Sequence, residues 1–512
     1  MVRLVVLFCA AGFLLGCSTP NSSPTNQNLE PSNLSGQELA VLHCGGCHIF
    51  PEPSLLDKQT WENSVLPAMA TRLGLGDWVN QFMGRSEEEI KHILATGLYP
   101  ERPMLAQEDW EKIKAYYIDQ APDQPLPQSE HIRADSNLSQ FEPVILPVTL
   151  SMPPQVTAIK VHPTAKELYI AKRNNSLLIL DHTWREKKLV PIAGPISDMS
   201  WQGDQWLGLK MGQMEPNDRF EGELWSYNSL FVKDTQPLAS KLQRPVDMVW
   251  GDLNRDDIPD AVICSFGFET GHLSWRDGKS GKLQLIKPQA GARNVVLADV
   301  NGDSLLDIVA MFTQGKESIV AFINQGRGQF EEKIWLEFPP VYGSSHFQFV
   351  DVTQDGLPDI VYTNGDNGDY SNSLKPYHGV HIFENQGTKG FKKIFFYPLY
   401  GATKTLVADF DKNGLPDFAV SAFYAPITQP ESPGFVLLSQ TKPNQWKPET
   451  FPMAKWGNWM VMDVGDLDRD GDLDIFLGSF QRGRQSIRPI PSKLKSLPEV
   501  IWLKNQYSQA NK

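Results

Sequence analysis

After residue 150, short apolar runs alternate with polar turns, and one arrangement of them returns five times along the chain. In each copy an apolar run leads into an aspartate-rich loop and a second apolar run follows it, as with Trp459–Met462 before the last loop. Apolar runs of this length, bounded by turn residues, are typical of β-strands. We therefore expect each loop to join two neighbouring strands.

The five loops share oxygen-bearing side chains at their first, third, fifth and ninth positions. Oxygen ligands around a tight turn suit Ca2+, so we expect up to five Ca2+ ions, one in each loop. The alternative is five aspartate-rich turns that hold no ion, against which stands the repulsion between carboxylates that a cation relieves. The expected ligands are Asp252, Asn254, Asp256 and Asp260; Asp299, Asn301, Asp303 and Asp307; Asp351, Thr353, Asp355 and Asp359; Asp409, Asp411, Asn413 and Asp417; and Asp466, Asp468, Asp470 and Asp474.

These loops differ from an EF-hand, which needs a bidentate glutamate at position 12 and a helix on each side. The glycine expected at position 6 is replaced in two loops by Asp257 and Ser304. Position 12 is apolar or aromatic in every copy, namely Ile263, Ala310, Tyr362, Val420 or Leu477.

The loops begin at residues 252, 299, 351, 409 and 466, and a repeat of this size with about four strands is typical of a propeller blade. Between 128 and 245 the loop is absent, yet strand-like runs continue and predict two degenerate blades. Together with the five looped blades they make seven. We expect a strand within Phe141–Leu150 to help close the ring. The degenerate blades are predicted from Val156–Val161, Glu167–Ala171, Ser176–Leu180, Asp198–Trp201, Gln205–Leu209 and Gly222–Ser226.

The N-terminus has the pattern of an export signal. A basic start is followed by an apolar stretch, Leu4 to Leu15, that is too short to span a bilayer. The stretch ends in Leu14-Leu15-Gly16-Cys17, which resembles the lipobox of bacterial lipoproteins. We therefore expect a signal peptide over 1–16, lipidation of Cys17 and a polar tether over 17–34, with cleavage by ordinary signal peptidase as the alternative. Ser18 resembles the outer-membrane sorting pattern, so we expect anchorage to a bacterial membrane, facing the periplasm or the cell surface.

A second motif, Cys44-Gly45-Gly46-Cys47-His48, has the spacing at which c-type haem is attached. Two thiols add to the haem vinyl groups, and the histidine takes the proximal position on the iron. A thioredoxin-like redox pair or a zinc site would leave His48 unexplained, and no second ligand pair for zinc is present in the sequence. We expect one covalently bound haem c.

The motif lies in a region that predicts a small all-α domain, residues 35–127. Ser35 and Glu38 form a capping-box pattern, and helices are expected over Thr60–Leu73, Ser86–Ala95 and Gln107–Ile118. This region resembles a monohaem cytochrome c. The resemblance gives two main candidates for the sixth iron ligand: Met104, before the final helix, and Met69, in a stretch similar to the methionine ligand region of another monohaem group. Met83 and a purely structural role for these methionines are the alternatives.

The chain as a whole resembles FG-GAP or VCBS repeat proteins, and more closely the lipoproteins, common in the Bacteroidetes, that join a cytochrome c domain to such a propeller. The expected fold is thus a small all-α cytochrome c domain followed by an all-β seven-bladed propeller over 128–512. The family has no settled activity. The resemblance rests on Cys44–His48 with Phe50–Pro53, Trp61–Met69, Asn364–Tyr370, Lys375–His378 and Gly465–Gly471.

Strand order places the aspartate loops on one face of the propeller and the loops between the second and third strands on the other. The latter differ greatly in length, and they are Gly267–Thr270, Asn364–His378, Phe423–Pro433 and Arg482–Arg484. Long polar loops on a rigid ring are where binding or catalysis would be built, although a polar loop that only satisfies itself is the alternative. The candidate residues are Asp366, Asp369, Tyr370, Lys375, Tyr377, His378 and Arg482.

A formal net charge of -13 argues against nucleic acid as a partner, because phosphate neutralisation needs a basic surface. Three functions fit the sequence. The chain is an electron-transfer protein whose propeller docks a periplasmic or surface redox partner, a haem-linked oxidoreductase that acts on a sugar or alcohol, or a surface module that binds glycan or protein. The oxidoreductase would need a second redox centre, because a haem with two axial ligands has no open position.

Overall fold

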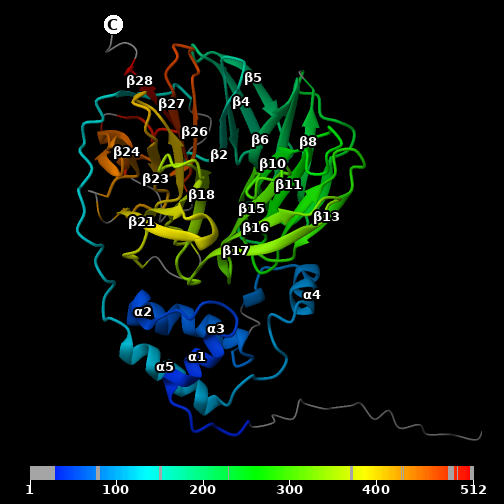
Figure 1. Cartoon of the computed structure of the whole chain (residues 1–512), viewed down its shortest axis with the longest axis vertical. Coiled ribbons are helices and arrows are strands. Elements are labelled where there is room, and N and C mark those ends of the chain that lie inside the picture. The colour runs from blue at the N-terminus through cyan, green and yellow to red at the C-terminus, as the bar shows by residue number, and fades with distance from the viewer. Residues whose placement is uncertain are drawn as a thin grey trace, which may run out of the picture.

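The computed structural model describes residues 29–76, 81–148, 153–228, 230–368, 373–427, 429, 432–481, 489–492 and 494–507. Within these residues the chain forms a small helical unit followed by seven four-stranded antiparallel sheets arranged as a propeller (Figure 1). The expected signal peptide, Cys17 and most of the expected tether lie outside the described residues. No described helix is both long and apolar enough to cross a membrane.

The helical unit begins at a capping box. The Ser35 side chain accepts a hydrogen bond from the Glu38 amide, and the Glu38 carboxylate accepts one from the Ser35 amide, as the sequence predicts. Ser86 and Glu89 repeat this arrangement at the second expected start. The helices and turns of the unit are α1 (Gly36–Cys44), η1 (Pro53–Leu55), α2 (Lys58–Thr60), the π-helical η2 (Trp61–Val65), α3 (Leu66–Arg72), α4 (Glu87–Ala95) and α5 (Gln107–Gln120).

The helical unit has its own hydrophobic core, centred on Trp61 and Tyr117. Both side chains are 1% exposed, and their rings lie 4.4 Å apart. Each also places its polar atom on a backbone carbonyl, because the Trp61 Nε1 donates to Pro53 and the Tyr117 hydroxyl donates to Pro51. Burial of such large rings with their polar atoms satisfied stabilises the unit and fixes α5 against η2.

The tether is attached to the helical unit before residue 35. The Ser32 amide donates to Asp109, and the Lys112 Nζ donates to the Ser32 carbonyl, at 2.8 and 2.7 Å. Both partners lie on α5. The end of the expected tether is therefore part of the helical unit, and the unit begins a few residues earlier than the sequence predicts.

Each blade consists of four consecutive strands, except the last. They are β2 (Val156–Val161), β3 (Glu167–Lys172), β4 (Ser176–Asp181) and β5 (Glu186–Pro191) in blade 1; β6 (Ile196–Gln202), β7 (Gln205–Lys210), β8 (Gly222–Tyr227) and β9 (Ala239–Leu242) in blade 2; β10 (Pro245–Gly251), β11 (Asp260–Ser265), β12 (His272–Arg276) and β13 (Leu283–Lys287) in blade 3; β14 (Ala292–Ala298), β15 (Asp307–Phe312), β16 (Glu317–Asn324) and β17 (Phe330–Phe338) in blade 4; β18 (Ser344–Val350), β19 (Asp359–Asn364), β20 (Gly379–Asn385) and β21 (Phe391–Pro398) in blade 5; β22 (Lys404–Ala408), β23 (Asp417–Ser421), β24 (Phe435–Lys442) and β25 (Gln445–Glu449) in blade 6; and β26 (Trp459–Gly465), β27 (Asp474–Ser479), β28 (Val500–Asn505) and β1 (Phe141–Ile145) in blade 7.

The ring is closed by pairing the first propeller strand with the last. Strand β1 lies antiparallel to β28, with Phe141 opposite Asn505 and Ile145 opposite Ile501. This confirms the closing strand expected within Phe141–Leu150. The two degenerate blades and the five looped blades are also confirmed, since blades 1 and 2 are complete four-stranded sheets.

The core of the propeller lies between neighbouring blades. Every residue of β11, β15, β19 and β27 is buried, because the second strand of a blade is covered on both faces by the adjoining sheets. The outermost strands are largely exposed to solvent, as in β17. This explains why the apolar runs after the aspartate loops are continuous, whereas those of the outer strands are not.

The innermost strands of all blades except blade 6 carry a repeated irregularity. The register shifts near the second residue of β2, β6, β10, β14, β18 and β26. A bulge at this point turns the side chain that follows, which includes Asp198, Asp247 and Asn294. These side chains also join neighbouring blades: the Val295 amide donates to Asp247, and the Phe347 amide donates to Asn294.

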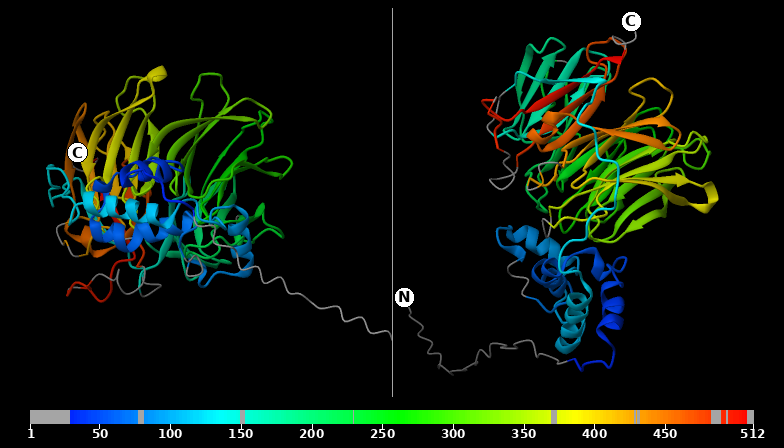
Figure 2. Two further views of the ribbon diagram at one scale, coloured as in Figure 1. Left: turned by 90° about the horizontal axis from the view of Figure 1, so that it is seen from below. Right: turned by 90° about the vertical axis from the view of Figure 1, so that its left-hand side faces the viewer.

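The helical unit packs against the propeller on the side that carries the loops between second and third strands (Figure 2). The Tyr377 hydroxyl of blade 5 donates to the Leu55 carbonyl, and the Asp218 amide of blade 2 donates to Glu89. Val341, between blades 4 and 5, joins the helical core. The helical unit therefore covers part of the face on which a ligand or partner was expected.

Candidate functional site

The aspartate loops have one backbone geometry in all five copies. Position 6 has a positive φ throughout, including 63° at Asp257 and 66° at Ser304, where the glycine is missing. Aspartate tolerates this left-handed conformation better than most residues, whereas the serine is the less usual case. In the last loop the two carboxylate oxygens of Asp466 accept hydrogen bonds from the amides of Asp470 and Gly471.

The ninth-position aspartate has a structural task in addition to any role as a ligand. In blade 6, one oxygen of Asp417 accepts from the Phe410 amide and the other from the Gln440 amide on the third strand. The same pairing ties the loop to the third strand at Asp260, Asp307 and Asp359. These aspartates are fully buried, and they hold the loop in place through neutral backbone donors.

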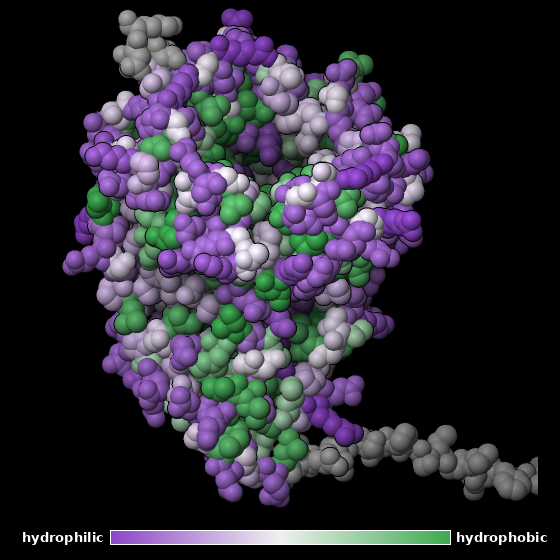
Figure 3. Space-filling model, in the orientation of Figure 1, coloured by the Kyte–Doolittle hydropathy of each residue, from purple (hydrophilic) through white to green (hydrophobic). Residues whose placement is uncertain are grey.

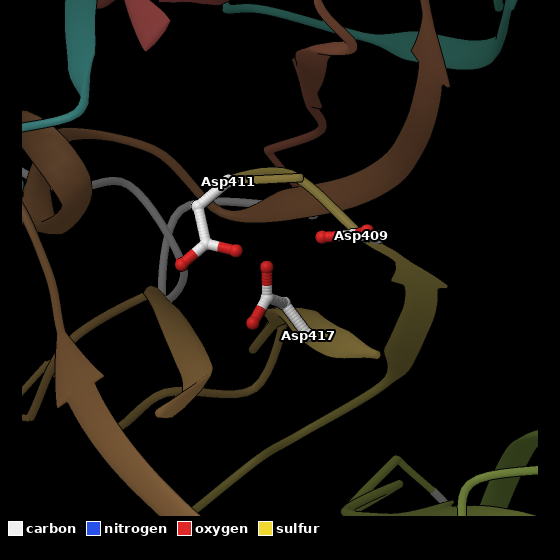
Figure 4. Close-up of side chains that lie close together, drawn as sticks. All are labelled: Asp409, Asp411 and Asp417. Carbon is white, nitrogen blue, oxygen red and sulfur yellow. The ribbon is translucent and has the colours of Figure 1, made fainter. Parts of the chain in front are cut away.

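Two loops bring three carboxylates close enough to share one cation. One oxygen of each of Asp409, Asp411 and Asp417 lies within 4.8 Å of the others (Figure 4), and Asp466, Asp468 and Asp470 form the second such group. Burial, with added repulsion from neighbouring carboxylates, raises the pKa of Asp417 to about 7 and that of Asp474 to about 7. In Asp474 the Oδ2 atom is buried without a hydrogen-bond partner. The Ca2+ expectation stays a prediction.

The Cys44–His48 motif follows directly from the end of α1. Both thiols are free, with Cys44 half-buried and Cys47 exposed. Burial raises the pKa of Cys44 to about 11, although a hydrogen bond with the Tyr117 hydroxyl acts in the opposite direction. The His48 Nδ1 lies 3.0 Å from the Ile49 carbonyl. When Nδ1 donates this hydrogen bond, Nε2 is left to bind a metal, and burial lowers the pKa of His48, which favours the neutral ligand form.

The two candidate methionines lie in different environments. Met69 is partly buried against the helical core, in the cluster that also contains Cys44 and Phe50. Met104 is 55% exposed. The apolar side chains Val41, Leu42 and Ile49 are 51%, 59% and 39% exposed next to the motif. Figure 3 shows apolar surface gathered on the helical unit. The donor set and this uncovered apolar surface both fit a covalently attached haem.

The loop of blade 5 is divided between two environments. Asp366 faces the propeller centre and forms an ion pair with Arg293 at 3.3 Å. Lys375 and His378 are 7% and 1% exposed, and the Tyr377 ring stacks on Tyr342 at 4.5 Å. Burial lowers the pKa of His378 well below its usual range. Lys375 and His378 are therefore away from solvent, and Tyr377 contacts the helical unit through its hydroxyl. Asp369, Tyr370 and Arg482 lie outside the described residues.

The sequence did not reveal the polar interface that holds the helical unit. Asp218, fully buried in blade 2, forms an ion pair with Arg85. The same Asp218 accepts hydrogen bonds from the amides of Phe268, Glu269 and Thr270 at 3.0, 2.9 and 2.8 Å. Glu269 in turn contacts Arg72 and accepts from the Tyr99 hydroxyl. A buried carboxylate thus fixes one propeller loop and one helical segment together.

A cavity of about 320 Å³ lies at the propeller centre, lined by the innermost strands of all seven blades. Figure 3 shows a hollow in the middle of the propeller. Its wall carries the side chains that follow the bulges, including Asp198, Asp247, Asn294 and His346. A polar residue in the middle of an otherwise apolar inner strand, as in Val246-Asp247-Met248, is the sequence signal that identifies them.

A protein-family comparison matches residues 299–362 to the family described as an FG-GAP-like repeat. The propeller carries FG-GAP repeats. The match runs from the aspartate loop of blade 4 to β19 of blade 5. A curated relative, integrin alpha-4 of Xenopus laevis, is 26% identical over 143 residues, which cover 25% of this chain and 14% of the relative. The chain therefore spans only a small part of that protein. Such a propeller indicates a ligand-binding or protein-interaction module.

Several solved structures match most of the chain at low sequence identity. The N-terminal domain of Nup159 is 10% identical, with a TM-score of 0.42, over 74% of this chain and 98% of that chain. U3-55K is 9% identical, with a TM-score of 0.43, over 71% and 98%. The RRP9 WD40 repeats are 9% identical, with a TM-score of 0.42, over 73% and 99%. No functional statement follows from likeness at this level.

Proposed function

We propose that the chain is an exported, membrane-anchored c-type cytochrome in which the helical unit transfers electrons and the FG-GAP propeller docks a partner or substrate. The observation that carries this proposal is the Cys44–His48 motif at the end of α1, with two free thiols and a histidine whose Nδ1 faces a carbonyl. Haem, when bound, supplies one-electron transfer. Cys44 and Cys47 would hold it covalently, and His48 would bind its iron.

The proposal requires one covalently bound haem for each chain. Protein matured in a host that attaches c-type haem should give the pyridine haemochrome spectrum of a thioether-linked haem in a ratio of about one to one. Replacing both Cys44 and Cys47 with serine should remove it, whereas replacing Cys264, which is buried in blade 3, should leave the haem content unchanged. Absence of haem in the parent protein would refute the electron-transfer function.

The environment of the methionines favours Met69 as the sixth ligand. Met69 packs in the same apolar cluster as Cys44, whereas Met104 is exposed. We therefore expect Met69→Ala to abolish the sulfur-to-iron charge-transfer band of the oxidised protein, and Met104→Ala to retain it. Absorption spectra of the two matched variants decide between them. Loss of the band in Met104→Ala alone would reverse the assignment, and its survival in both would require another ligand.

The propeller would bind up to five Ca2+ ions in the aspartate loops, as the carboxylate groups at Asp409–Asp417 and Asp466–Asp470 support. Anchorage through Cys17, and a position facing the periplasm or the cell surface, belong to the same proposal. A second candidate is an oxidoreductase that acts on a sugar or alcohol. It is favoured by the central cavity, which gives the propeller an open space lined by both polar and apolar side chains for a small substrate.

A further inference from the structure

The central cavity has the dimensions of a small-molecule site. Its volume of about 320 Å³ is near the lower end of the range for ligand pockets, about 300 to 1,000 Å³. A ligand of one sugar ring fits this volume better than a folded partner does. The cavity wall is rigid, because its side chains stand on the innermost strands and several of them bond to the next blade.

The wall is cationic relative to the rest of the protein. Five lysines and arginines line the cavity, against four aspartates and glutamates, although the whole chain has a formal net charge of -13. Three of the cations are paired with the acids: Arg173 with Glu215, Arg293 with Asp366, and Lys160 with Asp198. With Asp463, whose charge acts on both Lys160 and Lys404, the acids equal the cations, so the cavity lacks the acidic excess of the whole chain and admits an anionic ligand more readily than the rest of the protein does.

Lys404, at the start of β22, is the cation best placed to meet that ligand. Its Nζ donates to the Met462 carbonyl at 3.0 Å, and no described carboxylate lies within ion-pair distance of it. On the neighbouring inner strand, β18, the His346 Nδ1 is buried without a hydrogen-bond partner. A buried polar atom without a partner is costly. A ligand that supplies both a carboxylate and hydroxyl groups would satisfy Lys404 and His346 together.

Aromatic rings supply the other half of a sugar site. Phe266 is buried under the guanidinium groups of Arg244 at 5.1 Å and Arg293 at 5.9 Å, so it orients these two cations and leaves the sugar face to Phe423 and Tyr424. Phe423 and Tyr424 of blade 6 lie edge to face at 4.7 Å. All three rings line the cavity. The apolar C–H face of a pyranose ring packs on such rings, whereas a simple inorganic anion gains nothing from them.

From these observations we infer that the central cavity of the propeller binds a carboxylate-bearing sugar, either free or at the end of an acidic glycan. Lys404 and the arginines of the cavity wall bind the carboxylate, and the aromatic rings pack on the face of the sugar. His346 and the amide groups of the wall form hydrogen bonds with the hydroxyl groups. This inference rests on the docking role proposed for the propeller and does not depend on the haem.

Calorimetry with the full-length protein at low salt tests this inference, with glucuronate, glucose and acetate as probes. Glucuronate should bind at least tenfold more tightly than either of the others, because only glucuronate presents both a carboxylate and a pyranose ring. Lys404→Met keeps the aliphatic stem and should weaken glucuronate binding at least tenfold. The matched control Lys333→Met, on the exposed strand β17, should leave it unchanged.

Each other outcome overturns the inference. Equal binding of glucose and glucuronate would remove the role of the carboxylate, equal binding of acetate would remove that of the sugar, and parental affinity in Lys404→Met would place the site elsewhere. If that variant does not fold, Arg173→Gln, whose side chain is 37% exposed, replaces it with the same expected direction. Haem content measured on the same sample separates the two proposals: glucuronate binding without haem refutes only electron transfer, and haem without glucuronate binding refutes only this inference.

Discussion

Replacing Asp218 with alanine should lower the free energy of unfolding by about 3 to 5 kcal/mol, the usual cost of removing one partner of a buried ion pair. The substitution removes the partner of Arg85 and also the acceptor for three consecutive amides, Phe268 to Thr270. Urea titration followed by intrinsic fluorescence should show the loss. Limited proteolysis should then cut between the helical unit and the propeller, because this carboxylate holds them together.

Glu215→Ala provides the matched control for Asp218→Ala. Glu215 comes from the same loop of blade 2 and also pairs with an arginine, Arg173, but the two side chains are 57% and 37% exposed. An exposed pair of this kind contributes about 0 to 1 kcal/mol. If both variants lost stability equally, or if Asp218→Ala were neutral, the polar interface would not be what holds the helical unit in place.

Chelation of Ca2+ should lower the melting temperature of the protein markedly. An ion bound only by the folded state adds about 2.7 kcal/mol for each loop at a hundredfold excess over the dissociation constant, and five loops are available. Differential scanning calorimetry with and without chelator, together with elemental analysis, measures the effect. An unchanged melt in protein that contains no calcium would show that the loops are held by their own hydrogen bonds.

Asp411→Asn should change the melting temperature in opposite directions depending on whether the loop binds Ca2+. The asparagine keeps the oxygen that accepts from the Asn413 amide but removes one charge beside Asp409 and Asp417. If the loop binds Ca2+, the variant loses a charged ligand and melts at a lower temperature in calcium. If the loop binds no ion, the variant relieves repulsion and melts at the same or a higher temperature.

Stability without calcium should also depend on pH in a defined direction. The pKa of Asp417 and of Asp474 is about 7 in the folded chain, against 3.8 for an unperturbed aspartate. The folded state therefore binds more protons than the unfolded state between these values, and the free energy of unfolding falls as the pH rises through this window. Bound Ca2+ replaces those protons and should remove this loss.

Local signals predicted much of the fold. The five loops repeat at near-constant spacing, and their strands, the two capping boxes and the closing strand lie where the sequence indicates. Asp257 and Ser304 interrupt the glycine pattern, yet each takes the same positive φ, because the surrounding hydrogen bonds impose it. The π-helical turn at Trp61–Val65 has no comparable signal, since its residues fit an ordinary α-helix equally well.

Contacts between the helical unit and the propeller could not be predicted from the sequence. Arg85 and Asp218 are 133 residues apart, and neither belongs to a motif. The loop ending at His378 is predicted as a binding site because it is long and polar; the structure buries Lys375 and His378 and sets the Tyr377 hydroxyl against Leu55 of the helical unit, and the binding role stays a prediction. A polar loop at an internal interface and one at a ligand site have the same composition. Which surface a neighbouring unit covers is decided only in three dimensions.

Pairing of β1 with β28 also determines when, during synthesis, the ring of blades can close. The last helix of the helical unit ends at Gln120, and β1 begins soon afterwards at Phe141. The partner of β1 is β28, the last of the described strands. Until β28 has been made, blade 7 lacks its third strand and β1 has no partner, so blades 1 to 6 form an open arc whose two end sheets expose the apolar faces that a neighbouring blade would bury. Contacts this distant along the chain form late. The ring can therefore close, and become resistant to proteases and to association through its exposed end faces, only after β28 has been synthesised.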